Sequence, residues 1–230
     1  MYAKFFKRVM DFVLSLCALI VLSPVLLILV VLGAVIMKGN PFFTQLRPGK
    51  DEKIFKMIKF RSMTCETDAN GNLLPDEVRL TKYGKFLRST SLDELPELAN
   101  IVWGDMSIVG PRPQLVRDMV FMTPEQRRRH SVRPGLTGLA QCSGRNNITW
   151  EQKFEYDLQY IDDSITLWND IKILLKTIEK VVKREDTVRE GMATDMDFGD
   201  WLLEKGSIDR VRYEAGQAEA RALMEERKNE

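Results

Sequence analysis

The chain has 230 residues, of which 44% are hydrophobic and 29% are charged, enough for one well-buried domain with at most a small appendage. Its 34 basic and 33 acidic side chains leave a net charge of +1, so overall charge gives no argument for a nucleic-acid partner. The three cysteines are far apart and lack the paired spacing of zinc or redox motifs, which favours a reducing compartment.

The first predicted element is a membrane helix. Residues 12–37 are almost uninterruptedly apolar and would extend about 39 Å as a helix, longer than the roughly 30 Å hydrocarbon core. Ser23-Pro24 lies at its middle, where proline removes a backbone hydrogen bond and predicts a sharp kink. Basic residues flank both ends, so we expect the helix to enter and leave the same leaflet, with a kinked single-pass anchor as the alternative. Asp11 is expected at the interface, with Lys7 and Arg8 as partners.

The elements that follow are short. Residues 41–45 and 53–60 alternate well enough to predict a β-hairpin. Residues 68–72 read as a polar turn, and residues 80–87 and 95–103 as short helices.

Glycine and proline divide the middle of the chain. Residues 105–113 contain too much of both for a regular element, so we expect a fixed loop that presents Arg112 between two prolines. Thr123 and Gln126 form a capping-box signature for a helix ending near His130, which is expected to be a solvated group on a basic helix end. Residues 133–141 are expected to be a second rigid, glycine-punctuated stretch.

The last third of the chain is helical and then polar. Apolar residues at a 3.6 period across 167–182 predict the longest soluble amphipathic helix, with its apolar side packed in the core. Residues 208–230 carry few apolar anchors and predict either a loosely docked helix or a frayed tail.

Two adjacent carboxylates, Asp93 and Glu94, allow two interpretations. Ser91-x-x-Glu94 fits a capping box, and acidic groups are favoured at a helix N-terminus. A helix starting near Asp93 instead keeps Pro96 within the first turn and leaves the Asp93 carboxylate at the helix end. Neighbouring helical residues diverge by about 100°, so the two carboxylates are expected to perform different tasks.

Cations are frequent in the irregular segments around this pair. They are Lys59, Arg61, Arg88, Arg112, Arg133 and Arg145. Scattered arginines are usually solvated, but next to rigid loops their guanidinium groups suit phosphate. An acidic pair with several arginines indicates Mg²⁺ and a diphosphate, and therefore a metal-assisted phosphoryl enzyme at a membrane surface.

Several contiguous motifs resemble, in order, those of the bacterial sugar transferase family, the small monotopic phosphoglycosyl transferases. They are Lys7-Arg8-x-x-Asp11, Ser23-Pro24, Phe43-Thr44-Gln45-x-Arg47-Pro48-Gly49, Lys59-Phe60-Arg61-Ser62-Met63, Leu92 to Leu98, Gly104 to Pro113 and Arg133 to Gln141. The resemblance covers roughly residues 1–200. Gly144-Arg145-Asn146, Trp150 to Tyr160 and Glu190 to Thr194 are most similar to the short enzymes that start N-linked glycan or other acetamido-sugar pathways.

The resemblance implies transfer of a sugar-1-phosphate from a UDP-sugar to polyprenyl phosphate, with release of UMP. Asp93 matches the nucleophile that forms a covalent phosphosugar intermediate, and Glu94, with Asp93, matches the Mg²⁺ site. The phosphate or nucleotide contacts would come from Lys59, Arg61, Arg88, Arg112 and Arg145. Asp157 is either a supporting acid or a structural residue.

The resemblance also implies an α+β organisation: a re-entrant membrane helix at 1–38, a mainly helical catalytic domain with a small β-hairpin at 39–198, and a polar helix or tail at 199–230. The expected location is the cytoplasmic membrane of a bacterium, with the catalytic domain facing the cytoplasm. Expected partners are UDP-sugar, undecaprenyl phosphate, membrane lipid, a second copy of the chain and downstream glycosyltransferases, and no nucleic acid. A membrane-anchored nucleotide-binding scaffold without catalysis is the weaker alternative.

Overall fold

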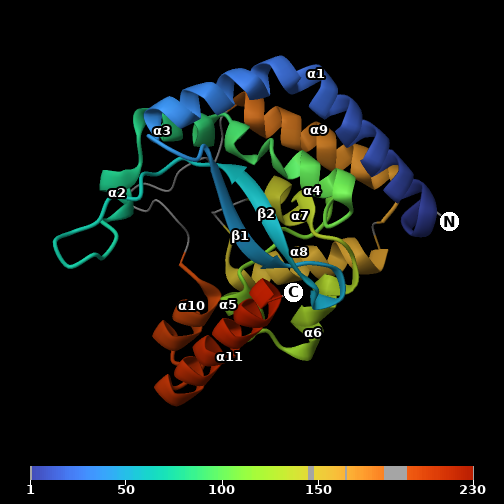
Figure 1. Cartoon of the computed structure of the whole chain (residues 1–230). Coiled ribbons are helices and arrows are strands. Elements are labelled where there is room, and N and C mark those ends of the chain that lie inside the picture. Colours follow the sequence, from blue (N-terminus) through green and yellow to red (C-terminus); the bar gives the residue numbers. More distant parts are fainter. Residues whose placement is uncertain (1, 145–147, 164, 184–195, 230) are drawn as a thin grey trace.

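A small β-hairpin lies among helices, and one long apolar helix runs along the edge of the molecule (Figure 1). The computed structural model describes residues 2–144, 148–163, 165–183 and 196–229. Its helical elements are η1 (Tyr2–Phe6), α1 (Lys7–Ile36), η2 (Lys50–Glu52), α2 (Asp76–Arg79), α3 (Lys82–Ser89), η3 (Leu92–Glu94), α4 (Glu97–Trp103), α5 (Val116–Met119), α6 (Pro124–Arg127), η4 (Arg128–Ser131), α7 (Leu139–Ser143), α8 (Trp150–Asp163), α9 (Leu167–Lys183), α10 (Phe198–Glu204) and α11 (Arg210–Asn229). The strands are β1 (Phe42–Pro48), β2 (Ile54–Phe60), β3 (Ser107–Val109) and β4 (Gly135–Thr137).

The predicted hairpin is confirmed. β1 and β2 pair antiparallel, with Phe42 opposite Phe60 at one end and Pro48 opposite Ile54 at the other. Met57, on β2, is buried in a cluster with residues of α4 and α1. The hairpin therefore links the membrane helix to the body of the domain.

Each of the two glycine- and proline-rich stretches contains a short strand, which corrects the expectation that residues 105–113 form a loop without a regular element. β3 and β4 pair in parallel, with Ser107 opposite Gly135. A Cβ atom on Gly135 would lie 2.1 Å from the backbone nitrogen of Gly110, so only glycine permits this approach of the two segments. The glycines that argued against a strand are what allow the pairing.

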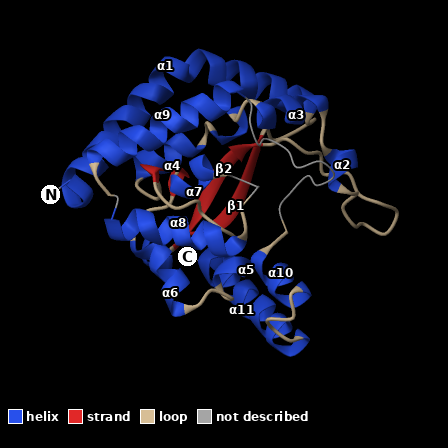
Figure 2. Ribbon diagram, turned by 180° about the vertical axis from the view of Figure 1, so that it is seen from behind, coloured by secondary structure: helices blue, strands red, loops and turns tan. Residues whose placement is uncertain are grey.

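Helix α1 is continuous through Pro24. Proline cannot donate to the carbonyl of Ile20, and the hydroxyl of Ser23 donates to that oxygen instead, at 2.7 Å. Among the described residues, one helix is long and apolar enough to cross a membrane, and it is this one. Helix α1 runs along the edge of the domain (Figure 2), and one stripe of it, including Leu22 and Leu29, packs against that domain. Most of its other apolar side chains are exposed.

Asp11 is buried, which corrects the expected interfacial contact with Lys7 and Arg8. Its carboxylate accepts hydrogen bonds from the hydroxyl of Ser107, at 2.6 Å, and from the backbone N–H of Ile108, at 3.1 Å. Lys7 pairs with a carboxylate on α9, and Arg8 donates to carbonyls at the end of α4. Asp11 therefore fixes α1 to β3.

The basic segment after α6 is also buried. The capping box of Thr123 and Gln126 is confirmed, but the helix becomes a 3₁₀ turn at η4, where only 2% of Arg129 and 6% of His130 are exposed. His130 is therefore not a solvated group. Burial, and then the charge of Arg129, lowers its pKa to about 3, so the imidazole is neutral.

The two last long helices differ from expectation. α9 buries Ile173 but exposes Leu175 and Ile178 to 61% and 59%, so its apolar side is only partly core. α11, with 20 residues, is longer than α9, with 17.

Helices α10 and α11 are docked on the body, so the frayed-tail interpretation is wrong. The ring of Phe121 stacks on Tyr213, and Cβ atoms on Gly199 and Gly216 would come within 2.5 and 2.4 Å of that ring. Arg227, near the end of α11, donates to the backbone of β2 at 2.8 Å. Small residues thus let the two helices close around one aromatic side chain.

Candidate active site

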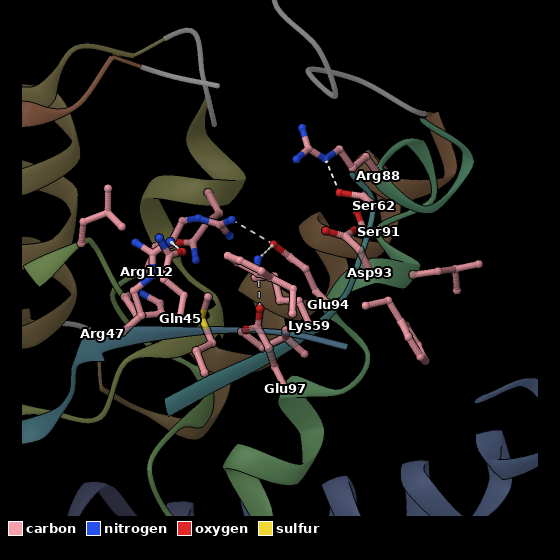
Figure 3. A pocket seen from close by; sticks show the side chains of 18 of the residues that line it. Gln45, Arg47, Lys59, Ser62, Arg88, Ser91, Asp93, Glu94, Glu97 and Arg112 are labelled. Carbon is pink, nitrogen blue, oxygen red and sulfur yellow. Dashed lines mark hydrogen bonds and ion pairs between the residues drawn. The ribbon is translucent and has the colours of Figure 1, made fainter. Parts of the chain in front are cut away.

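A cleft of about 2040 Å³ opens between the hairpin, η3 and the segment after β3. Figure 3 shows Asp93, Glu94 and Glu97 within it, with Lys59 and Arg112 directed toward the glutamates. Elements that are distant in sequence thus bring the acidic pair and the predicted cations together.

The acidic pair lies on a 3₁₀ turn of its own. Ser91, which precedes it, has a left-handed backbone conformation (φ 55°) and no capping hydrogen bond from its side chain. Helix α4 begins only at Glu97, immediately after Pro96. The predicted capping box at Ser91 therefore does not form, and the helical start expected near Asp93 is a single 3₁₀ turn from Leu92 to Glu94. The turn, separated from α4 by the proline, presents the carboxylates to the cleft.

Glu94 is held by two cations. Its Oε1 accepts from the ammonium of Lys59 at 2.8 Å and from the guanidinium of Arg112 at 2.9 Å. Although burial alone would raise the pKa of Glu94, the charges of Lys59 and Arg112 lower it below its usual range. Lys59 also lies 3.0 Å from Glu97, whose pKa burial raises to about 7. Glu94 is therefore a fixed negative charge.

Asp93 has the opposite electrostatic character. Burial, and then the neighbouring charge of Glu94, raises the pKa of Asp93 to about 6, while Lys59, Arg88 and Arg112 partly oppose this shift. A desolvated carboxylate with a raised pKa is more basic and less well stabilised than a solvated aspartate. The two acids thus differ as two distinct tasks require.

The other predicted cations are distributed unevenly. Arg88 and Arg61 line the cleft, where Arg88 donates to the hydroxyl of Ser62 at 3.1 Å. Arg145 lies outside the described residues. Arg133 does not line the cleft and donates to the carbonyl of Gly104 at 2.7 Å.

Asp157 acts through another residue. Its carboxylate is 2% exposed and accepts two hydrogen bonds from the guanidinium of Arg129, at 2.9 and 2.6 Å. Arg129 in turn donates to the backbone carbonyl of Arg112 at 2.7 Å. Of the two predicted roles for Asp157, the contacts favour the structural one, because this chain positions the segment that carries Arg112.

Three residues of the site were not predicted. Arg47 lines the cleft, and its described hydrogen bond is to Gln45, a neutral partner, at 2.7 Å. Burial, and then repulsion from Arg112, lowers the pKa of Arg47 to about 10, which still leaves it charged at neutral pH. Arg47 belongs to the Phe43–Gly49 motif, which could have identified it as a site residue. Glu97 could have been identified from its spacing, three residues after Glu94. The buried Arg129 sits in a run of arginines that resembles a solvated surface.

The carboxylates fit a magnesium site that substrate completes. Among residues 2–144, 148–163, 165–183 and 196–229, no cluster of three or more acidic, histidine or cysteine ligands could hold an ion. Mg²⁺ commonly takes one or two carboxylates and completes its octahedron with water and substrate phosphates. Both described contacts of Glu94 use Oε1, so Oε2 and the carboxylate of Asp93 are the candidate ligands.

Comparison with known proteins is consistent with these observations. The chain is 46% identical over 179 residues to the uncharacterized sugar transferase EpsL of Bacillus subtilis, covering 78% of this chain and 88% of that protein. It is 43% identical over 185 residues to a UDP-glucose:undecaprenyl-phosphate glucose-1-phosphate transferase of Klebsiella pneumoniae, and 36% over 201 residues to an undecaprenyl-phosphate galactose phosphotransferase of Salmonella typhimurium. These two matches cover 76% and 80% of this chain but only 40% and 42% of those longer proteins. The profile of the bacterial sugar transferase family matches residues 2–184, and the chain therefore belongs to that family.

Proposed function

We propose that the protein transfers a sugar-1-phosphate from a UDP-sugar to undecaprenyl phosphate, giving a lipid diphosphate sugar and UMP. The observation that carries this proposal is the pairing of a desolvated Asp93 with a Glu94 fixed by Lys59 and Arg112. The names of the relatives support the reaction class. The long apolar helix supports a membrane-bound acceptor.

The reaction proceeds in two displacements at phosphorus. An oxygen of Asp93 attacks the phosphorus that bears the sugar, and the bond to the bridging oxygen breaks, so that UMP leaves with the electron pair. An oxygen of undecaprenyl phosphate then attacks the same phosphorus and releases the Asp93 carboxylate. Lys59 and Arg112 offset the repulsion between carboxylate and diphosphate that would otherwise prevent the first step.

The remaining residues bind and orient the substrate. Arg47, Arg61 and Arg88 line the same cleft and provide contacts for the second phosphate or the nucleotide. Mg²⁺, held through Glu94 and Asp93, supplies charge neutralisation for the diphosphate oxygens when it is bound.

UMP release tests the proposal directly. The full-length protein, with undecaprenyl phosphate and Mg²⁺, is incubated with a panel of UDP-hexoses and UDP-acetamido sugars, and UMP is measured. We propose an acetamido sugar, on the resemblance of the motifs around Gly144 and Trp150, although the named relatives include glucose and galactose transferases. Binding of UDP-sugar without UMP from any of them would support the scaffold alternative instead.

We also propose that α1 enters and leaves one leaflet, with the domain on the cytoplasmic side. Both halves of the helix, on either side of Pro24, contact the same domain: Asp11 bonds to Ser107, and the carbonyl of Leu29 accepts from Tyr83 at 2.8 Å. A spanning helix would separate one of these halves from a domain on a single side. The contacts support the re-entrant topology.

Single cysteines at Lys4 and Lys38, in a protein without native cysteines, are expected to react with an impermeant maleimide from the same side of the membrane. Both should be protected in sealed, right-side-out vesicles and labelled after permeabilisation. A cysteine at Lys85, in the domain, provides the cytoplasmic reference. Labelling of position 4 or 38 alone in sealed vesicles would establish a spanning anchor.

The raised pKa of Asp93 predicts a pH dependence for the first displacement. Only the ionised carboxylate is a nucleophile, so the single-turnover rate without lipid should rise with pH through about 6 and level off above it. Rapid-quench measurement of UMP between pH 5 and 8 checks this, with circular dichroism at pH 5 as the control for folding. A rate independent of pH across this range would contradict the assignment.

A further inference from the structure

A second cavity, of about 440 Å³, lies beside the first turns of α1 and shares no lining residue with the catalytic cleft. Strand β3 forms the wall between the two. Successive residues of a strand point to opposite faces, and Ile108 faces the cleft while Ser107 and Val109 face this cavity. We call it the basic cavity, after the charges that line it.

The charges of this cavity do not balance. Its cationic lining residues are Lys4, Lys7, Arg8, Lys50 and Arg133, and its acidic lining residue is Asp11. Lys7 is neutralised by Asp170 at 2.7 Å, whereas Asp11 keeps its negative charge while it accepts hydrogen bonds from β3. Four cations and one carboxylate are left to determine the local potential.

The two arginines among these four are oriented by helix α4. Arg8 donates to the carbonyls of Ile101 and Val102 at 2.6 and 2.9 Å, and Arg133 donates to that of Gly104 at 2.7 Å. Carbonyls at a helix end offer only a partial negative charge. No ion pair to either arginine is found within the described part of the chain, and the carboxylates whose charges act on Arg8 are those of Asp11 and Asp105.

The two lysines are similarly uncompensated. Lys4 has no ion pair among the residues that the structure describes, and Lys50 approaches Asp51 only at 4.0 Å, with both side chains largely exposed. Such an exposed pair contributes little stability. The cavity therefore presents a concave, positively charged surface from three separate segments of the chain.

The position of the cavity indicates the ligand. Its N-terminal wall is continuous with the first turns of the membrane helix, where Phe5, Phe6 and Phe12 are exposed. Exposed apolar rings at the start of a membrane helix suit contact with lipid, so we expect the cations on the same turns, Lys4 and Arg8, to lie near phospholipid headgroups. A phosphate is the anion most abundant there, and guanidinium groups suit it.

We propose that the basic cavity binds a phosphate group, provided by the headgroup of an anionic phospholipid. The bound lipid fixes the start of α1 relative to β3, because Arg8 and Asp11 are one turn apart and reach α4 and β3. The proposal is independent of the reaction in the catalytic cleft. If the cations serve only to cap α4, the cavity has no preference for anionic lipid.

The test uses the full chain in detergent micelles, titrated with phosphatidylglycerol, with phosphatidylcholine, or with inorganic phosphate, and native mass spectrometry measures bound lipid. We expect saturable binding of one phosphatidylglycerol. The double variant Lys4→Gln/Lys50→Gln should weaken it about 25-fold, since each lysine near an anionic surface contributes a factor of about five. Lys38→Gln/Lys56→Gln removes the same charge outside the cavity and should leave the affinity unchanged.

Each outcome separates the alternatives. If phosphatidylglycerol binds more weakly to Lys4→Gln/Lys50→Gln, the cavity variant, but not to the control variant, the proposal is supported with lipid as the source of the phosphate. In another outcome, inorganic phosphate displaces the lipid from the wild type but does not bind to the cavity variant. That result supports the same site, with a free anion as its ligand. Equal weakening in both double variants, or equal affinity for phosphatidylcholine and phosphatidylglycerol, would overturn it. Circular dichroism confirms that both variants are folded.

Discussion

Replacement of Asp93 by asparagine is expected to abolish both UMP release and the covalent phosphosugar adduct. Asparagine preserves the shape of the side chain but cannot act as the nucleophile. Loss of the nucleophile should lower turnover by on the order of 10³-fold or more. The adduct is measured by intact-mass spectrometry of protein incubated with UDP-sugar and Mg²⁺ but without lipid, where the wild type should gain one phosphosugar.

A matched control distinguishes this role from the loss of any carboxylate in the cleft. Asp76 also lines the cleft and pairs with Arg79, so Asp76→Asn removes a carboxylate without removing the proposed nucleophile. It should keep the adduct and most of the turnover. Full activity of Asp93→Asn would exclude the nucleophile assignment, and ternary-complex kinetics without any adduct would favour direct transfer, with Asp93 as a metal ligand only.

The sequence predicts the site better than it predicts the connections that support it. Asp93, Glu94, Lys59 and Arg112 were found from charge pattern and family motifs, and the structure brings all four into one cleft. Adjacent charges and contiguous motifs can be recognised locally in the sequence, and so can the alternation that predicted the hairpin.

The sequence-based predictions that the structure corrects share a physical cause. Burial of Asp11, Arg129 and His130 depends on which segments pack together, and no local pattern reports that. β3 and β4 pair in parallel although both lie in segments whose glycines argue against a strand. Glycine is nevertheless what permits the two segments to approach each other. α11 was ambiguous because the residues that it buries fully, Gly216 and Ala220, are small, whereas larger ones such as Tyr213 pack only partly buried against the core.

The largest expected effect on stability comes from the buried pair of Arg129 and Asp157. Asp157→Asn leaves the guanidinium of Arg129, which is 2% exposed, without its counter-charge. Removing one partner of a buried ion pair typically costs about 3–5 kcal/mol. Chemical denaturation in detergent should show this loss. Arg128→Met, at the adjacent position, breaks ion pairs that are largely exposed, and should therefore cost much less than Asp157→Asn.

A double variant separates stability from catalysis. Arg129→Met/Asp157→Leu removes both buried charges, so much of the lost free energy of unfolding should return. It cannot restore the hydrogen bond from Arg129 to the carbonyl of Arg112, so the segment that carries the Arg112 guanidinium stays less well positioned against Glu94. We therefore expect kcat/KM for UDP-sugar to remain reduced in a protein that is again stable. If both the free energy of unfolding and kcat/KM recovered in the double variant, Asp157 would be a purely structural residue. If Asp157→Asn were as stable as the wild type, the buried ion pair itself would be contradicted.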